Sequence, residues 1–230
     1  MLQVKRIENK FLINQQERLQ TIRRLDAIMP RDAHSTSSQG YEVRTLYFDT
    51  LADRCCAEKE EGLRVHEKIR ARIYGTDDKV IKLECKHKDG AFQVKESLLI
   101  DRPTLEELAR GRYECLRELK DPKALFFYKK LSAGMFPKVI IQYQRLSYCL
   151  NVNNIRITFD SDIRATECCT DLFRQNLQAH PVLPPDQVIL EVKYNHFLLG
   201  YVKDALRGLN KSPASYSKYF SGRTFYRRYI

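Results

Sequence analysis

Polar and apolar residues alternate along much of the chain, which is the pattern of β-strands with one buried face. In KIRARIYG, residues 68–75, the cations Lys68, Arg70 and Arg72 alternate with small or branched apolar residues. Comparable runs predict about eight strands, near residues 3–13, 43–49, 67–74, 79–86, 91–100, 138–149, 154–163 and 187–194.

Several of these predicted strands carry charged residues along their polar face. Glu8 shares a face with Lys10, and Glu191 shares one with Lys193. The same alternation groups Lys82, Glu84 and Lys86 on one strand, and Arg156, Thr158 and Asp160 on another. The strands near 43–49 and 138–149 are less regular. A sheet with one face in water would explain the charged faces as well as an enclosed site would.

Apolar residues recur with helical spacing between the strands, near residues 15–29, 103–119, 122–133, 170–179 and 197–209. This mixture indicates an α+β protein dominated by antiparallel strands. If the helices cover the apolar faces, the charged faces point toward each other, and about eight twisted strands can close into a barrel. We therefore expect an antiparallel tunnel barrel with a charged lumen and with helices packed outside.

Two short segments, RDAHSTSSQG and AHPVLPPD, are polar or proline-rich and are typical of loops within a domain. We therefore expect residues 1–230 to form a single domain. No segment approaches the roughly 20 apolar residues of a membrane span, and the seven cysteines lack C-x-x-C spacing. Both features favour a cytoplasmic location.

The chain is basic, with 40 Lys and Arg against 29 Asp and Glu and a formal net charge of +11. This charge predicts a polyanionic partner, which could be nucleic acid, acidic lipid or a phosphate chain. Cations in a lumen need counter-charges, and Glu191 there would suit Mg²⁺ or Mn²⁺ beside phosphate oxygens. A nucleic-acid duplex would not enter an eight-stranded tunnel, so nucleic acid is not expected.

Other familiar chemistry has little support in the sequence. The nine glycines form no G-x-x-x-x-G-K-[ST] loop, which excludes a P-loop NTPase. The five histidines show no metal-ligand spacing, and the cysteines show no zinc spacing. Glu191 itself could simply form an ion pair with a lysine across the sheet.

A set of short motifs carries a family resemblance. In chain order they are YFDT, EEG, KIRARIYG, IKLECKHKDG, QVKES, QYQR, IRITFDSDI, ILEVKY and SYSKY, and the resemblance covers nearly the whole chain, from about Lys10 to Tyr219. This ordered set resembles the catalytic domain of the vacuolar transporter chaperone (VTC) polyphosphate polymerases, in the triphosphate tunnel metalloenzyme or CYTH-like superfamily. The resemblance implies a basic tunnel that moves the terminal phosphate of ATP onto polyphosphate, with Mn²⁺ or Mg²⁺ as cofactor.

The resemblance also implies roles for individual residues. It matches the catalytic basic residues to Lys10, Arg70, Arg72, Arg145, Arg156 and Lys218. Phosphate-binding side chains correspond to Lys86, Lys95, Tyr143 and Ser217, and metal ligation corresponds to Glu191 with Glu8 as a second candidate. We expect the arginines to grip the triphosphate while the end of the growing chain supplies the attacking oxygen.

The chain departs from the family pattern in three places. No residue securely matches an upstream tunnel arginine, although Arg54 or Arg64 could take its place. The first strand carries Glu8 but lacks the other glutamate of the E-x-E-x-K signature in the triphosphatase branch. The phosphate-sensing domain and membrane segments of eukaryotic polymerase subunits are also missing, so we expect any coupling to membrane export to need a membrane partner.

Three function classes remain open from the sequence. Polyphosphate polymerase is the leading prediction, with ATP and polyphosphate as ligands. A triphosphatase or nucleoside triphosphatase of the same superfamily is the nearest alternative, because water can replace the chain end. A non-catalytic polyphosphate-binding domain would keep the basic lumen but would not need the metal carboxylate, so Glu191 argues against it.

Overall fold

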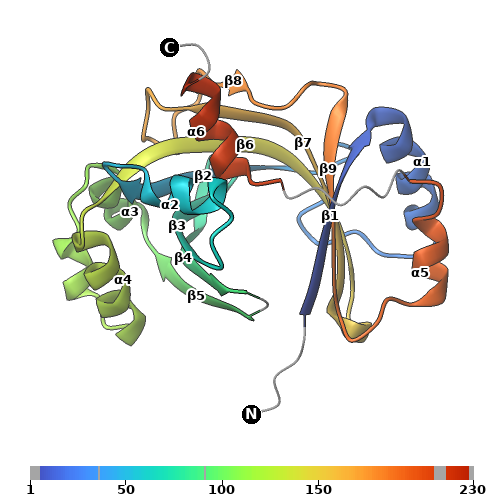
Figure 1. The fold of residues 1–230 in the computed structure, drawn as a ribbon, viewed down its shortest axis with the longest axis horizontal. Coiled ribbons are helices and arrows are strands. Elements are labelled where there is room, and N and C mark those ends of the chain that lie inside the picture. The colour runs from blue at the N-terminus through green and yellow to red at the C-terminus, as the bar shows by residue number, and fades with distance from the viewer. Residues whose placement is uncertain (1–5, 36, 91, 210–215, 228–230) are drawn as a thin grey trace. The chain divides into compact units, whose positions relative to one another are not determined.

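The fold is described here from a computed structural model, which describes residues 6–35, 37–90, 92–209 and 216–227. In chain order the elements are β1 (Arg6–Asn14), α1 (Gln15–Asp26), β2 (Tyr41–Thr50), α2 (Arg54–Glu60), β3 (Val65–Tyr74), β4 (Asp77–Asp89), β5 (Phe92–Ile100), α3 (Arg102–Ala109), the 3-10 helix η1 (Glu114–Glu118), α4 (Pro122–Ser132), β6 (Met135–Leu150), the 3-10 helix η2 (Val152–Asn154), β7 (Ile155–Thr166), β8 (His180–Pro181), β9 (Gln187–Asn195), α5 (Gly200–Ala205) and α6 (Lys218–Arg227) (Figure 1).

The strands hydrogen-bond in the order β1-β9-β7-β6-β2-β3-β4-β5, and β8 pairs with β7. Pairing is antiparallel for β1–β9, β7–β9, β2–β3, β3–β4 and β4–β5. Each of the eight predicted strands is present, so the α+β class built on antiparallel strands is confirmed. Closure of this sheet into a tunnel stays a prediction.

The chain divides into two compact units. The first unit contains Met1–Glu42, Tyr143–Ile163 and Leu183–Ser217, and the second contains Val43–Gln142, Arg164–Val182 and Lys218–Ile230. Three of the five boundaries fall inside β2, β6 and β7, so each of these strands contributes residues to both units. The single domain expected for residues 1–230 stays a prediction.

In the first unit, helices α1 and α5 cover the apolar face of the strands. The buried cluster joins Leu25 of α1 and Val202 of α5 to Ile157, Phe159, Leu190 and Val192 of β7 and β9. Helix α1 begins with a capping box, because the Asn14 side chain accepts from the Glu17 amide at 2.8 Å and the Glu17 carboxylate accepts from the Asn14 amide at 2.9 Å. With the apolar face covered, the alternate residues of β7 and β9 lie on the charged face.

In the second unit, the same alternation holds on β3. Ile69, Ala71 and Ile73 are fully buried, which leaves the cations between them on the other face. Helices α2, α3 and α4 contact β3, β4 and β5 respectively. The helices predicted near 122–133 and 15–29 are confirmed as α4 and α1.

The helix predicted near 170–179 is wrong, because this segment consists of turns. The Asp171 side chain accepts from the Phe173 amide at 2.9 Å, which fixes a local turn. The Arg44 guanidinium of β2 donates to the carbonyls of Leu172 and Arg174 at 3.0 and 2.6 Å. These two carbonyls therefore accept hydrogen bonds from a side chain. In a helix they would accept from backbone amides of the same segment.

Other helix predictions differ in extent. The helix expected over 103–119 is divided into α3 and η1, with Gly111 between them at φ +77°. The helix expected over 197–209 is shorter, as α5. Helices α2 and α6 and the short strand β8 were not predicted. The seven cysteines are free, and no helix in the described part of the chain is long and apolar enough to cross a bilayer.

Candidate functional site

The charged face of the first unit is built by three neighbouring strands. Lys10 of β1 lies opposite Glu191 of β9, which lies opposite Thr158 of β7. In the adjacent row, Glu8, Lys193 and Arg156 lie opposite one another in the same order. Lys10 therefore lies opposite Glu191, and Glu8 lies opposite Lys193, and such pairs of opposite charge stabilise the β1–β9 pairing locally.

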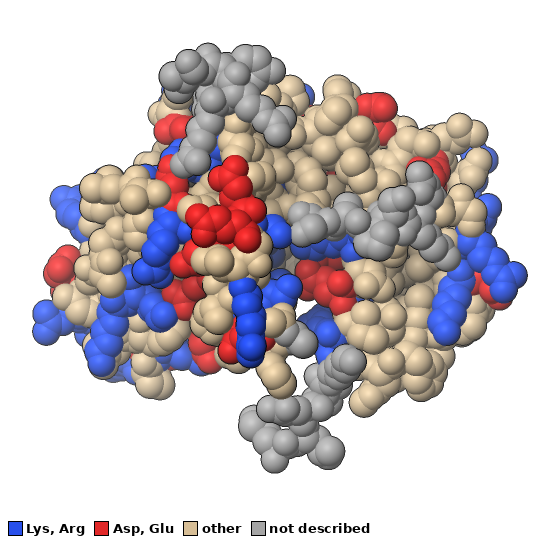
Figure 2. All heavy atoms as spheres, viewed as in Figure 1, with Lys and Arg blue, Asp and Glu red and all other residues tan. Residues whose placement is uncertain are grey.

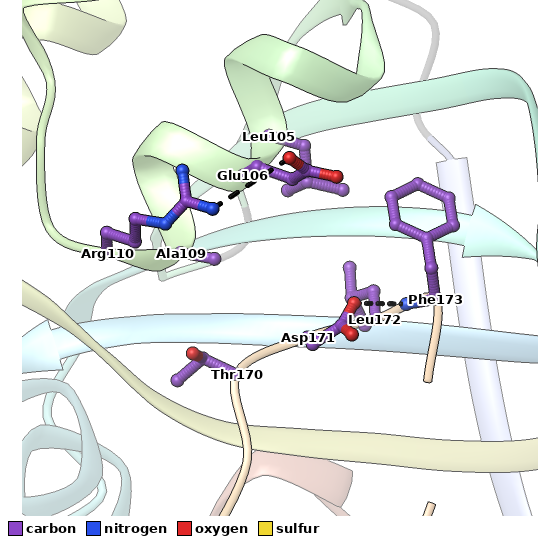
Figure 3. A pocket seen from close by; sticks show the side chains of 8 residues that line it. All are labelled: Leu105, Glu106, Ala109, Arg110, Thr170, Asp171, Leu172 and Phe173. Atoms are coloured by element: carbon purple, nitrogen blue, oxygen red, sulfur yellow. Dashed lines mark hydrogen bonds and ion pairs between the residues drawn. The ribbon is translucent and has the colours of Figure 1, made fainter. Parts of the chain in front are cut away.

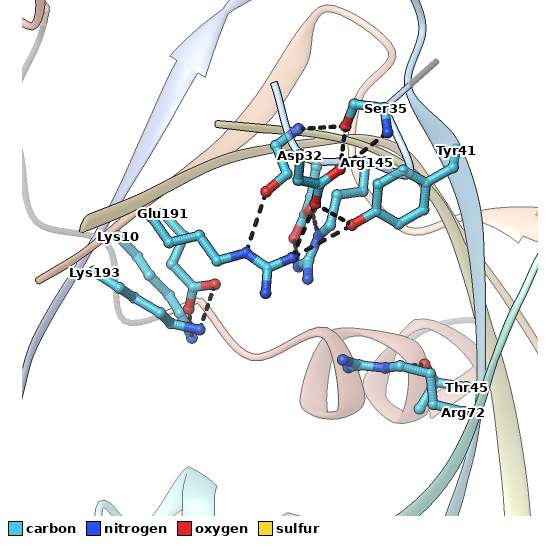
Figure 4. A network of polar contacts seen from close by, with 12 residues as sticks. Lys10, Asp32, Ser35, Tyr41, Thr45, Arg72, Arg145, Glu191 and Lys193 are labelled. Carbon is cyan, nitrogen blue, oxygen red and sulfur yellow. Dashed lines mark hydrogen bonds and ion pairs between the residues drawn. The ribbon is translucent and has the colours of Figure 1, made fainter. Parts of the chain in front are cut away.

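Two glutamates and two lysines form a ring on this face. Lys10 Nζ lies 3.2 Å from Glu8 Oε1 and 3.5 Å from Glu191 Oε1, and Lys193 Nζ lies 3.7 Å from Glu8 Oε2 and 2.9 Å from Glu191 Oε2. Figure 4 shows both lysine side chains converging on Glu191. Burial alone would raise the pKa of the Glu191 carboxyl, but Lys193 and Lys10 hold it well below its usual value.

Arg145 of β6 is fixed by a buried carboxylate. Its Nε and Nη2 atoms donate to the two carboxylate oxygens of Asp160 on β7, each at 2.7 Å, and Asp160 is completely buried. Burial would lower the pKa of the Arg145 guanidinium, but Asp160 raises it well above its usual value. The guanidinium also lies 5.2 Å from the centre of the Tyr143 ring, which adds a cation–π contact.

Arg156 of β7 contacts the loop that precedes β2. Its Nε donates to Ser147 Oγ at 3.1 Å, and its Nη2 lies 3.3 Å from Asp32 Oδ2 and 3.4 Å from Tyr41 Oη. Gly40 allows the loop to pack against β6, because a Cβ at this position would lie 2.0 Å from the Arg145 carbonyl oxygen. The predicted site residue Arg156 is therefore held in place by Ser147 of β6 together with Asp32 and Tyr41.

A divalent cation would find a small set of hard oxygen donors in the first unit. Glu8 and Glu191 lie together around the same two lysines, and carboxylates suit Mg²⁺ and Mn²⁺. Over the described residues, no group of three or more His, Cys, Asp or Glu side chains could hold a metal ion. Mg²⁺ is usually bound by one or two protein carboxylates, and substrate phosphates complete its coordination. Glu8 and Glu191 fit such an ion.

In the second unit, a buried carboxylate is surrounded by cations. Glu84 of β4 is 2% exposed, and its Oε2 lies 2.8 Å from Arg70 Nη2 and 3.8 Å from Arg72 Nη1. Lys95 of β5 forms an ion pair with its other oxygen. Burial would raise the pKa of the Glu84 carboxyl, but Arg70, Arg72 and Lys95 lower it to about 2.

Three lysines lie opposite one another on the same face. Lys68 of β3 pairs in register with Lys86 of β4, which pairs with Lys95 of β5. Like charges directly opposite on neighbouring strands destabilise a sheet. An anionic ligand along this row would remove that cost, and neighbouring strands lie about 4.8 Å apart, close enough for one chain of charges to contact several lysines.

Tyr47 of β2 belongs to this face, although it was not among the predicted site residues. It lies opposite Arg70 in the sheet, and Arg70 Nη1 donates to its hydroxyl at 3.4 Å. Burial would raise the pKa of the Tyr47 hydroxyl, but Arg70, Arg72 and Lys68 lower it to about 8. The one signal in the sequence was the strand alternation, which places Tyr47 on the same face as Thr45. In the structure the Thr45 hydroxyl accepts from Arg72 Nε at 3.4 Å, so this face does contact the arginines.

The Tyr47 ring connects this face to helix α6. It stacks on Tyr219, with ring centres 5.0 Å apart, and the Tyr219 hydroxyl donates to the buried carboxylate of Asp49. Asp49 also accepts from the amides of Cys55 and Cys56 at the start of α2. The predicted residues Ser217 and Lys218 lie just before α6 and at its first position, and both are half-buried.

The two candidates for the upstream arginine lie outside the strands that carry these charged faces. Arg54 begins helix α2 and lies 3.2 Å from Glu58 one turn later. Arg64 precedes β3, is largely exposed and pairs with Asp89 at 2.7 Å. Arg64 continues the alternation of Arg70 and Arg72 in the sequence but stands before the first residue of β3, and Arg54 belongs to a helix.

A separate pocket of about 230 Å³ lies in the second unit, between α3 and residues 170–173 (Figure 3). It is lined by apolar side chains together with Glu106, Arg110 and Asp171, so it offers both signs of charge. On the face of the molecule in Figure 2, Lys and Arg lie interspersed with Asp and Glu. The cation-rich rows on the strands are therefore more selective for an anion than this pocket or that surface.

Comparisons with known proteins add a family and a fold. A family model described as the VTC domain matches residues 5–226. A solved structure of a candidate adenylate cyclase from Bacillus halodurans is similar with a TM-score of 0.52 and 9% identity, over 93% of this chain and 95% of that chain. Another from Vibrio parahaemolyticus gives 0.49 and 10%, over 97% and 99%. No curated protein sequence matches the chain.

Proposed function

The chain belongs to the VTC domain family, and from that premise we propose that it is an enzyme that transfers the terminal phosphate of ATP to a growing polyphosphate chain. The observation that carries the proposal is the cation-rich face of the second unit. There Arg70, Arg72 and Lys95 surround a single buried glutamate, and Lys68, Lys86 and Lys95 lie opposite one another in register, which favours the binding of an anion.

Phosphoryl transfer suits such a site because it needs alignment and charge stabilisation more than a nucleophilic side chain. The planar guanidinium groups of Arg70, Arg72, Arg145 and Arg156 match phosphate oxygens, and Lys10, Lys86 and Lys95 add charge. Tyr143 supports Arg145 through its ring, and Ser217 and Lys218 complete the proposed set. Their role is to bind and orient the anion.

Glu191, with Glu8 beside it, would hold Mn²⁺ or Mg²⁺, which would neutralise part of the phosphate charge. In the structure both carboxylates contact Lys10 and Lys193. Lys193 and Lys10 hold the pKa of the Glu191 carboxyl well below its usual value, so it is ionised, as an oxygen ligand of a metal must be.

A tunnel-type triphosphatase is the alternative function, and the position of Glu8 is the observation that favours it. Glu8 stands at the signature position of that branch and shares both lysines with Glu191, so two carboxylates could serve one cation. Water would then attack in place of the chain end.

The polymerase proposal also includes a cytoplasmic location and a membrane partner that removes the product.

The test is to incubate the purified protein with Mn²⁺ and ATP labelled in its terminal phosphate, and to resolve the products on a gel. Wild-type protein is expected to give a ladder of phosphate chains. Glu191→Gln should abolish it, because the neutral amide is a poor ligand for a hard cation. Glu106→Gln, at a surface ion pair on α3, is the matched control and should keep full activity.

The alternative outcomes separate the function classes. Free phosphate without a ladder would reject the polymerase and support the triphosphatase. Tripolyphosphate binding without turnover would reject both enzymes and support a binding domain. A ladder that survives in Glu191→Gln would support the polymerase but reject the metal role of Glu191.

A further inference from the structure

Thr158 has a buried hydroxyl that forms no hydrogen bond with any of the described residues. The side chain is 2% exposed and lies at the middle of β7. The other buried polar atoms of this kind belong to Arg18, Asp53, Gln142 and Arg223, whose side chains carry further polar atoms. Thr158 differs because the hydroxyl is the single polar group of its side chain.

The direction of the Thr158 side chain follows from its neighbours on β7. Ile157 and Phe159 lie in the apolar cluster under α1 and α5, so Thr158 faces the opposite side. Two residues away on the same face are Arg156 and Asp160, which bond to the 32–41 loop and to Arg145. On the neighbouring strand Thr158 lies opposite Glu191.

A buried hydroxyl without a partner costs free energy, because water has been removed and nothing replaces it. Native proteins contain few such groups, and one of them at a charged face calls for a ligand or another functional explanation. Valine has nearly the same shape and would avoid the cost. Apolar packing alone therefore does not account for threonine at this position.

We infer that the Thr158 hydroxyl donates a hydrogen bond to a phosphoryl oxygen of the bound substrate. This inference rests on the proposed function and adds a substrate-binding residue to it. The carboxylates of Glu191 and Asp160 already accept from lysines and from Arg145, so the charged face offers the hydroxyl no free carboxylate in the described structure. An anion drawn to Arg145 and Arg156 supplies the acceptor that the hydroxyl lacks.

The test measures binding of inorganic tripolyphosphate to the full chain by calorimetry, in Mn²⁺, together with thermal unfolding of the ligand-free protein. Thr158→Val is expected to weaken binding about tenfold, because a hydrogen bond to a charged acceptor is lost. Its unfolding temperature should equal or exceed that of wild type, because the unpaired hydroxyl is gone. Thr158→Ser keeps the donor and should bind like wild type.

Thr166→Val is the matched control on the same strand. The Thr166 hydroxyl accepts from the Cys168 amide at 3.4 Å, so its loss should lower the unfolding temperature and leave tripolyphosphate affinity unchanged. A structural role for Thr158 would give this same result in Thr158→Val and would overturn the inference.

Two further outcomes separate the inference from the proposed function. If wild-type protein binds tripolyphosphate and Thr158→Val binds it equally well, the inference fails and the proposed function stands. If wild-type protein does not bind tripolyphosphate, the proposed function fails, and the inference fails with it. Loss of Mn²⁺ binding in the absence of phosphate would assign the hydroxyl to the metal and would overturn its role as a phosphate donor.

Discussion

The two units carry charged strand faces that differ in how their charges are paired. In the first unit each cation of the candidate site lies against carboxylates: Arg145 against Asp160, Arg156 against Asp32, and Lys10 and Lys193 against Glu8 and Glu191. In the second unit three cations share Glu84. One face is close to balanced, and the other has an excess of positive charge.

This difference indicates a division of labour within the proposed function. Paired charges in the first unit fix side chains in defined positions, since a buried ion pair is costly to disturb. Excess cations in the second unit raise the local concentration of anions and are compensated when one binds. Within that proposal, the first unit would hold its side chains in fixed positions, and the second would attract the phosphate chain.

The largest expected effect concerns the pair in the first unit. Asp160→Asn leaves the Arg145 guanidinium buried without a counter-charge, and breaking a buried pair in this way costs roughly 3–5 kcal/mol. Denaturant unfolding should show a loss of this size in the free energy of unfolding.

Asp204→Asn provides the control for Asp160→Asn. Asp204 pairs with Arg207 at 3.0 Å on the surface, where both side chains are largely exposed, so the loss should stay under about 1 kcal/mol. If both variants lost equally little, Arg145 would not depend on Asp160, and the contrast between the units would disappear.

A smaller loss of stability, accompanied by a gain in anion binding, is expected in the second unit. Glu84→Gln removes the carboxylate that Arg70, Arg72 and Lys95 share, so the free energy of unfolding should fall by about 1–3 kcal/mol. The freed cations should bind tripolyphosphate several-fold more tightly at low salt, because no internal anion competes. Calorimetry at two salt concentrations measures this gain.

Glu96→Gln on β5 is the matched control for Glu84→Gln. Glu96 is more exposed and pairs with Lys123 at 3.7 Å, so neither stability nor affinity should change much. Weaker binding in Glu84→Gln would mean that Glu84 positions the arginines for phosphate. The second face would then resemble the first in its dependence on pairing.

The strands of this fold could be predicted from sequence because each has one buried face, which fixes a period of two. Ile69, Ala71 and Ile73 are an example, since burial of all three leaves only one side for the cations. Helix α2 could not be predicted in this way. Its capping carboxylate, Asp49, lies on the preceding strand and bonds to the amides of Cys55 and Cys56.

The candidate site was partly predictable for a similar reason. Arg70, Arg72, Glu191 and Lys10 follow the strand alternation, and the structure places them on the charged faces of their units. Asp32 and Tyr41 were missed because they come from a loop and its end, where no period applies. Tyr47 was missed because a buried tyrosine in a strand looks like a core residue until the register places it opposite Arg70.

The smallest expected effect depends on pH and tests whether the second face is governed by its cations. With the pKa of Tyr47 lowered to about 8, its phenolate forms beside Arg70 and Arg72 as the pH rises from about 7 to about 9. The phenolate competes with phosphate, so tripolyphosphate affinity should fall a few-fold over this range. In Tyr47→Phe the affinity for tripolyphosphate should fall less with pH, because no phenolate can form. The variant keeps the ring that stacks on Tyr219.

Stability should move in the opposite direction as the pH rises. The folded-state pKa of about 8 lies below the unfolded value near 10, so the contribution of Tyr47 is fully present above pH 10 and is lost as the pH falls through 8. Between pH 8 and 10 wild type should therefore gain stability relative to Tyr47→Phe, as denaturant unfolding would measure. Identical pH profiles in the two proteins would contradict the lowered pKa. Since Arg70, Arg72 and Lys68 are what lowers it, they would also contradict an excess of positive charge on the second face.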